Sequence, residues 1–455
     1  MFGVFEDSHM VPNKLPNSDQ RLATNEIRIV IMKMFKCKLA GVGAAIVCLT
    51  VSSSLAADVN AVLKNYADIA HAGYEDSLNT AKTLRNAVAA LAEVPSAEAL
   101  AAARGAWLAA RVPYQQTEVY RFGNKTVDDW EGKVNAWPLD EGLIDYVDRG
   151  SYGKTSEENR LYSANVIANA RLMVAGKPVD ASRITKTLLS DTLHEAEEVE
   201  ANVATGYHAI EFLLWGQDLN GTNFGAGKRP HSDFDVKNCS GGNCDRRVAY
   251  LLAVTDLMID DLHYIVKAWG PGGEARNSIL GAGKGGLIAI VTGMGSLSYG
   301  ELAGERMKLG LLLHDPEEEH DCFSDNTHNS HYYDAKGIRN VYLGRYNRTD
   351  GRVVRGASLA GLLKEKSPEL HLEMMANLDS TMLAMGALVQ AAEDGESYDQ
   401  MLGEGNKKGN ARVQQAIEAL VAQTKTIEKA VSALGLKSIA FEGSDSLDNP
   451  KAVFQ

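Results

Sequence analysis

Apolar residues recur at helical spacing along most of the chain. Over residues 59–91 they follow a period close to 3.6, which is typical of the buried face of a long helix. Pro95 ends this stretch, and Ser96 is a suitable N-cap for an alanine-rich helix over residues 97–111. The same spacing predicts further helices over residues 187–203, 206–215, 246–269, 287–313, 368–392 and 411–434. No stretch alternates with a period of two for long enough to build a sizeable sheet, so the pattern predicts an all-α protein.

A segment rich in Gly, Asn and Asp, residues 216–243, separates these helices into two groups. Such a composition favours a connection, because these residues adopt turn conformations readily. The simplest architecture is therefore two helical bundles packed together, over residues 57–235 and 236–440. Residues 441–455 are expected to form a tail.

The start of the chain has the pattern of an export signal. Lysines between residues 33 and 38 precede an apolar run from Leu39 to Leu55, and small residues lead from this run into a polar stretch. This order is typical of a secretory signal peptide that is cleaved after Ala56. We therefore expect residues 1–56 to lie outside the mature fold. An uncleaved N-terminal anchor is the alternative.

Three cysteines follow the apolar run. Cys239 and Cys244 flank the short sequence Ser-Gly-Gly-Asn, and in an exported protein this spacing favours a small disulfide loop. A metal clip is the weaker alternative, because the two thiols have no nearby histidine. Cys322 is then the unpaired thiol, and we expect it to pack as a small apolar residue.

The composition excludes several classes of protein. With 46 Lys and Arg against 59 Asp and Glu, the formal net charge is −13, and no basic block is present that would bind nucleic acid. Hydrophobic residues make up 45% of the chain, which excludes disorder as its overall description. Only one apolar run approaches membrane-spanning length, so a polytopic membrane protein is excluded.

The segment Gly-Tyr-His-Ala-Ile-Glu at residues 206–211 carries the clearest local signal for chemistry. On a helix, His208 and Glu211 lie one turn apart and project from the same face. An imidazole and a carboxylate placed in this way can bind a metal together, as paired helix residues do in di-iron bundles. A hydrogen-bonded polar pair without a metal is the alternative.

A second segment, residues 317–328, concentrates carboxylates, a thiol and the two histidines His320 and His328. A solvated acidic loop is one interpretation of it. The apolar pair Cys322 and Phe323 in its middle indicates instead that part of the segment is buried.

Three further carboxylates are candidate ligands. Glu301 and Glu305 lie one turn apart on an otherwise apolar, small-residue helix, where carboxylates without partners are costly. Arg306 could neutralise one of them in an internal salt bridge. Glu118 shares a helix face with Arg111 and Tyr114, and packing with hydrogen bonds would also explain it.

With the Gly-x-His-x-x-Glu motif at 206–211 and the sequence Glu-His-Asp-Cys-Phe-Ser-Asp-Asn-Thr-His at 319–328, the chain resembles the iron-regulated protein A branch of the imelysin-like family. The resemblance extends from about Val59 to Leu434. It implies two helical bundles with the His-x-x-Glu motif near their interface. It also implies a bacterial protein, periplasmic or associated with the outer membrane, that is expressed under iron limitation and linked to iron uptake.

Members of this family have been called metallopeptidases, and one feature of this chain departs from that activity. A zincin needs His-Glu-x-x-His and an inverted zincin needs His-x-x-Glu-His, but Phe212 follows Glu211 here. A catalytic zinc would need further ligands from distant positions and a free carboxylate as base.

Three hypotheses for the function follow. The first is the binding of iron, or of an iron-bearing ligand, by His208 and Glu211 with carboxylates from Glu118, Glu301 or Glu305. An iron-transport or outer-membrane protein would then be the partner. Haem, with His208, His320 or His328 as axial ligand, is a variant of it. The second is an imelysin-type zinc peptidase, and the third is a non-catalytic helical partner-binding protein with a polar core network.

Overall fold

Helices make up most of the computed structural model, which describes residues 58–454. Within this range the strands form two short antiparallel hairpins: β1 (Arg171–Val174) with β2 (Lys177–Asp180), and β3 (Arg345–Asn347) with β4 (Val353–Arg355). The prediction of an all-α protein is therefore confirmed. The predicted signal peptide lies outside the described residues.

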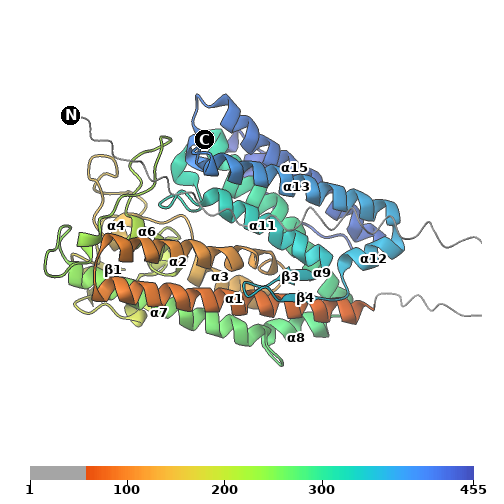
Figure 1. Ribbon diagram of the computed structural model, residues 1–455, viewed down its shortest axis with the longest axis horizontal. Coiled ribbons are helices and arrows are strands. Elements are labelled where there is room, and N and C mark those ends of the chain that lie inside the picture. The colour runs from red at the N-terminus through yellow and green to blue at the C-terminus, as the bar shows by residue number, and fades with distance from the viewer. Residues whose placement is uncertain (1–57, 455) are drawn as a thin grey trace, which may run out of the picture. The chain divides into compact units, whose positions relative to one another are not determined.

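Two long helices organise the first helical group. α1 packs along both α2 and α7 (Figure 1). The predicted N-cap is confirmed, because the Ser96 side chain accepts a hydrogen bond from the backbone N–H of Ala99 at the start of α2. The group comprises α1 (Val59–Glu93), α2 (Ala97–Gln115), α3 (Lys125–Asn135), α6 (Gly206–Trp215), α7 (Cys244–Trp269) and α8 (Glu274–Gly281), with the short turns α4 (Glu141–Ile144) and α5 (Lys186–Leu188) between them.

The second helical group is built on α13, which packs along α15 (Figure 1). α11 contacts α13 on one side and α2 on the other, so it joins the two groups. The group comprises α9 (Lys284–Ser296), a π-helical stretch (Leu297–Lys308), α10 (Leu309–Leu313), α11 (Thr327–Leu343), α12 (Leu359–Lys366), α13 (Pro368–Glu393), α14 (Tyr398–Leu402), α15 (Lys407–Ala433) and α16 (Asp445–Asp448).

The division into bundles at residue 236 stays a prediction. All the described residues belong to one compact unit. In addition, α1 precedes the predicted boundary and α7 follows it, yet the two helices pack on each other. The predicted tail at 441–455 contains α16, which packs on the π-helical stretch. The expected disulfide between Cys239 and Cys244 is present, and Cys322 is unpaired and half-buried.

The helix predicted over residues 187–203 is wrong. The structure has only short helical turns there, and Glu195, Glu197 and Glu198 adopt positive φ angles of 52°, 62° and 62°. Acidic side chains three residues apart repel one another on a helix, which weakens this segment. The side chain of Asn202 donates a hydrogen bond to the Ala196 carbonyl and so favours the alternative loop.

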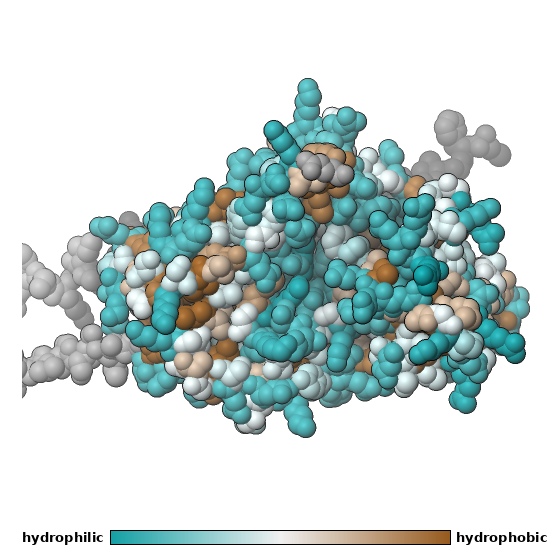
Figure 2. Space-filling view, turned by 180° about the vertical axis from the view of Figure 1, so that it is seen from behind, coloured by the Kyte–Doolittle hydropathy of each residue, from teal (hydrophilic) through white to brown (hydrophobic). Residues whose placement is uncertain are grey.

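The molecular surface is mainly hydrophilic on the face seen in Figure 2, where apolar residues gather only in small scattered patches. Of the helices that the structure describes, none is long and apolar enough by itself to cross a membrane. One bent pair, Cys244–Gly281 with Lys284–Leu313, meets that criterion by length and composition only.

Candidate metal centre

The backbone at Gly206 sets the position of α6. Gly206 has φ +79°, and a Cβ atom there would lie 2.4 Å from the carbonyl oxygen of Val134 on α3. Only glycine therefore allows α6 to begin this close to α3. Every residue of α6 is buried, so His208 and Glu211 enter the protein interior.

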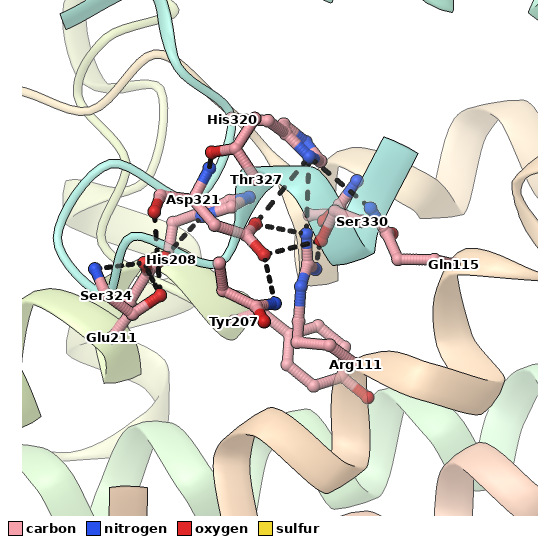
Figure 3. Close-up of polar contacts among 12 residues, drawn as sticks. Arg111, Gln115, Tyr207, His208, Glu211, His320, Asp321, Ser324, Thr327 and Ser330 are labelled. Carbon is pink, nitrogen blue, oxygen red and sulfur yellow. Dashed lines mark hydrogen bonds and ion pairs between the residues drawn. The ribbon is translucent and has the colours of Figure 1, made fainter. Parts of the chain in front are cut away.

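His208 and Glu211 form a buried hydrogen-bonded pair, as their spacing predicts. The His208 Nδ1 atom lies 2.9 Å from Glu211 Oε2, and the two side chains are 1% and 0% exposed. The other carboxylate oxygen of Glu211 accepts hydrogen bonds from the backbone N–H and the hydroxyl of Ser324, at 3.0 and 2.7 Å (Figure 3). The remaining ring nitrogen, His208 Nε2, has no hydrogen-bond partner within residues 58–454.

Two residues from the loop before α11 lie beside His208. One ligand atom from each of His208, His320 and Asp321 lies within 4.8 Å of the other two. The imidazole rings of His208 and His320 meet edge to face, with 4.7 Å between their centroids. The structure therefore brings two imidazoles and a carboxylate from distant parts of the chain to one buried point.

Asp321 is held in its charged form by its neighbours. Arg111 donates a hydrogen bond of 2.7 Å to Oδ1, and Asn326 donates one of 2.8 Å to Oδ2. Burial alone would raise the pKa of Asp321, but Arg111, together with His208 and the hydrogen bonds from Ser330 and Asn326, outweighs burial and holds the pKa below its usual range. The Arg111 guanidinium also lies 3.3 Å from His320 Nδ1. A metal ion would thus share Asp321 with a positive charge that is already in place.

The histidines of this region are neutral at physiological pH. Burial, reinforced by Arg111, lowers the pKa of His208 to about 3. Burial, reinforced by Arg306, lowers the pKa of His331 on α11 to about 3. His331 is fully buried, and neither of its ring nitrogens has a hydrogen-bond partner in the described part of the chain. Neutral imidazoles have the lone pair that metal binding requires.

Of the other predicted ligands, Glu118 and Glu301 lie around Arg306, and neither they nor Glu305 belong to the group at His208. The Arg306 guanidinium lies 2.7 Å from Glu118, 2.7 Å from Glu301 and 3.1 Å from Asp334. The internal salt bridge that the sequence left open for Glu301 is therefore formed. Glu305 is exposed on the same π-helical stretch. Glu118 and Glu301 thus already have a cation as partner.

Asn135 joins the two clusters. It accepts a hydrogen bond of 2.6 Å from Arg111, and its amide donates one of 3.4 Å to Glu118. One continuous buried network thus extends from Asp321 through Arg111 to Arg306. Sequence reasoning identified the segment that contains His320 but did not single out Asp321 or His331. The adjacent His-Asp pair beside the apolar Cys322–Phe323 was the available signal.

Two cavities lie beside residues that contact His320 or Asp321. The smaller, about 270 Å³, is lined by Arg111, Gln115 and Ser330, which contact His320 or Asp321. The larger, about 800 Å³, is lined by Trp137, whose ring lies 5.9 Å from that of His320. Six carboxylates line this larger cavity: Asp140, Glu141, Asp148, Asp218, Glu317 and Glu318. A cavity lined by one sign of charge concentrates ions of the opposite sign, here cations.

Glu141, which lines this cavity, should make the stability of the protein depend on pH. The side chain is 5% exposed, and burial, with a smaller contribution from Glu317, raises its pKa to about 8. Between about pH 4.5 and pH 8 the folded protein therefore holds a proton that the unfolded chain releases, so its stability falls as the pH rises. In the wild type, the free energy of unfolding should therefore fall from pH 6 to pH 8. In Glu141→Gln it should fall less steeply, by up to about 1.4 kcal/mol per pH unit. Urea unfolding at a series of pH values measures this, and the exposed Glu157→Gln is the control. An equal slope in Glu141→Gln and wild type would contradict the assignment.

The sequence of the chain matches a known protein family. The model of the Imelysin family matches residues 70–427. Iron-regulated protein A of Synechococcus elongatus is 23% identical over 354 residues, which cover 77% of this chain and 79% of that protein.

Two solved structures have a similar fold. An iron-regulated protein A precursor of Parabacteroides distasonis has a TM-score of 0.58 at 21% identity and covers 83% of this chain and 95% of its own. An imelysin-like protein of Psychrobacter arcticum has a TM-score of 0.53 at 14% identity, with 84% and 97% covered. The family match spans most of the chain and includes both the segment with His208 and the segment with His320 and Asp321, so this protein belongs to the imelysin family.

Proposed function

We propose that this protein binds an iron ion at His208, His320 and Asp321 and takes part in iron uptake as an exported protein. The observation that carries the proposal is the free ring nitrogen of His208, a fully buried atom without a hydrogen-bond partner within residues 58–454. Buried polar atoms in proteins are nearly always paired, so an unpaired one at such a cluster indicates a missing ligand. The link to iron is supported by the name of the Synechococcus relative, an iron-regulated protein.

The donor set suits iron. Two imidazoles and one carboxylate are the protein ligands of many non-haem ferrous sites, in which other positions stay open. The residues could thus hold the ion by three atoms and leave room for a further ligand. Structural zinc sites use mainly thiolates and imidazoles, and the thiol of Cys322 is outside this group.

Glu211 has a supporting role in this proposal. Its carboxylate contacts the ring nitrogen of His208 that faces away from the free one, and such a carboxylate fixes the orientation of a metal-binding histidine. Burial and the nearby Asp321 raise the pKa of Glu211 well above its usual range. A bound cation would favour the ionised carboxylate, so binding should release a proton.

A peptidase mechanism is less well supported by the geometry. A zinc peptidase needs a carboxylate that is free to accept a proton from water. Both oxygens of Glu211 already take part in hydrogen bonds, one with His208 and the other with Ser324. We therefore favour binding over catalysis.

Calorimetric titration of the chelator-treated protein with ferrous iron, without oxygen, tests the proposal. One equivalent should bind, and the affinity should increase between pH 6 and pH 8 because a proton is released. Incubation of the iron- or zinc-loaded protein with unfolded casein should leave the casein intact. Absence of saturable binding would refute the proposal, and chelator-sensitive cleavage of casein would favour the peptidase instead.

A further inference from the structure

A second group of carboxylates surrounds a small cavity outside the centre at His208. Asp218, Glu317, Glu319 and Asp399 line this cavity, and Asp325 is close enough to interact electrostatically with Asp399. We call these five residues the acidic pocket. The cavity has a volume of about 10 Å³. This is close to the smallest volume that holds one water molecule, and hence a single ion.

Glu319 is the most unusual member of the acidic pocket. Its side chain is 1% exposed, and neither carboxylate oxygen accepts a hydrogen bond from another described residue. The Thr327 hydroxyl lies nearby, but its geometry falls short of a hydrogen bond. A buried carboxylate without partners is costly, so this side chain lacks a group that would stabilise it.

Two other members, Asp399 and Asp325, have only part of their hydrogen-bonding capacity satisfied. Asp399 is 2% exposed, and one oxygen of Asp399 and one of Asp325 have no hydrogen-bond partner in the part of the chain that the structure describes. Burial and the neighbouring carboxylates raise the pKa of Asp325 to about 7 and that of Asp399 to about 6. The charge of Lys228 lowers the pKa of Asp325 slightly, but the Lys228 ammonium group donates its hydrogen bond to Asn220. Repulsion among these acids is thus only partly compensated.

We propose that the acidic pocket binds one divalent cation that prefers oxygen ligands, with Ca²⁺ as the best match. Ca²⁺ takes six to eight oxygen ligands in flexible geometry, and carboxylates from several segments can supply them. Mg²⁺ demands stricter octahedral geometry. Cys322 also lines the cavity, but a neutral thiol is a poor ligand for a hard cation.

The position of the acidic pocket suggests what the cation does. Asp218 follows α6, Asp399 belongs to α14, and Glu319 immediately precedes His320. A cation held by all three would tie the loop with His320 and Asp321 to both helical groups. Calcium binding should therefore stabilise the fold. It should also order the loop of the centre at His208, a consequence that rests on the proposed function.

Thermal unfolding of the full chain, purified with EDTA, tests the proposal. Addition of about 5 mM CaCl₂ should raise the melting temperature by about 3 °C. Glu319→Gln and Asp399→Asn should each abolish this rise, whereas Glu404→Gln, at an exposed position just after α14, should retain it. Without calcium, Glu319→Gln should melt at or above the wild-type temperature, because it removes a buried unpaired carboxyl group.

The variant His208→Ala separates this proposal from the iron site. It should keep the full response to calcium even if iron binding is lost, and the calcium response does not depend on the wild type binding iron. Absence of a calcium effect in the wild type, or an unchanged effect in Glu319→Gln, would overturn the proposal. A rise with ZnCl₂ but not with CaCl₂ would overturn it as well.

Discussion

Replacing His208 with alanine should reduce the affinity for ferrous iron by about 100-fold or more. The substitution removes the unpaired ring nitrogen, which is the best-placed donor of the centre, and leaves only His320 and Asp321. Two protein ligands hold a metal ion far less tightly than three, since the third binds with little further loss of freedom. Calorimetric titration of the chelator-treated variant measures the change.

Two further variants make the experiment specific. Glu211→Gln keeps the side-chain shape but weakens the orientation of His208, so it should cost about 10- to 100-fold in affinity, less than His208→Ala. His263→Ala removes an exposed histidine of α7 and should leave the affinity unchanged. Circular dichroism should confirm that all three variants are folded. An unchanged affinity in His208→Ala would show that iron does not bind at this centre.

Replacing Arg306 with methionine should cause a large loss of stability, about 3–5 kcal/mol in the free energy of unfolding. Arg306 is 3% exposed and pairs with Glu118, Glu301 and Asp334, of which Glu118 and Asp334 are buried. Removal of the guanidinium leaves these carboxylates close together without the cation that pairs with all three. Arg121 lies 3.6 Å from Glu301 and is close enough to Glu118 to interact electrostatically, but it compensates only in part.

Urea unfolding measures the effect of Arg306→Met, and Arg339→Met is its control. Arg339 makes an exposed ion pair with Asp379, which should contribute less than about 1 kcal/mol. Adding Glu118→Gln to Arg306→Met should restore part of the lost stability, because it removes one of the unpaired charges. Equal losses in Arg306→Met and Arg339→Met would contradict the importance of the buried network.

The sequence alone predicted the local part of the site correctly. The spacing of His208 and Glu211 placed them on one face of α6, and the structure shows the contact. An interaction over one helical turn depends only on the helix, so it can be read from the spacing. The metal-binding role of Glu211 stays a prediction. Its two carboxylate oxygens contact His208 Nδ1 and the hydroxyl of Ser324.

The partners across the fold could not be predicted in this way. Arg111 and Asp321 are 210 residues apart, and Glu118 and Arg306 are 188 residues apart. The sequence showed that buried carboxylates would need partners, but it could not distinguish an arginine from a metal ion as the partner. For Glu118 and Glu301 the fold supplies Arg306, whereas for Glu319 it supplies no cation among the described residues.

The sequence by itself determined the all-α class, the N-cap at Ser96, the disulfide between Cys239 and Cys244 and the pairing within α6. Each depends on residues close together in the chain, where spacing and side-chain type suffice. Only the tertiary structure decided that His320 and Asp321 lie beside His208, and that Arg306 takes Glu118 and Glu301 as its partners. These contacts join residues that are far apart in the sequence, so they depend on how the helices pack. A buried charge is stable only when it is paired, and the packing decides which group lies close enough to pair with it.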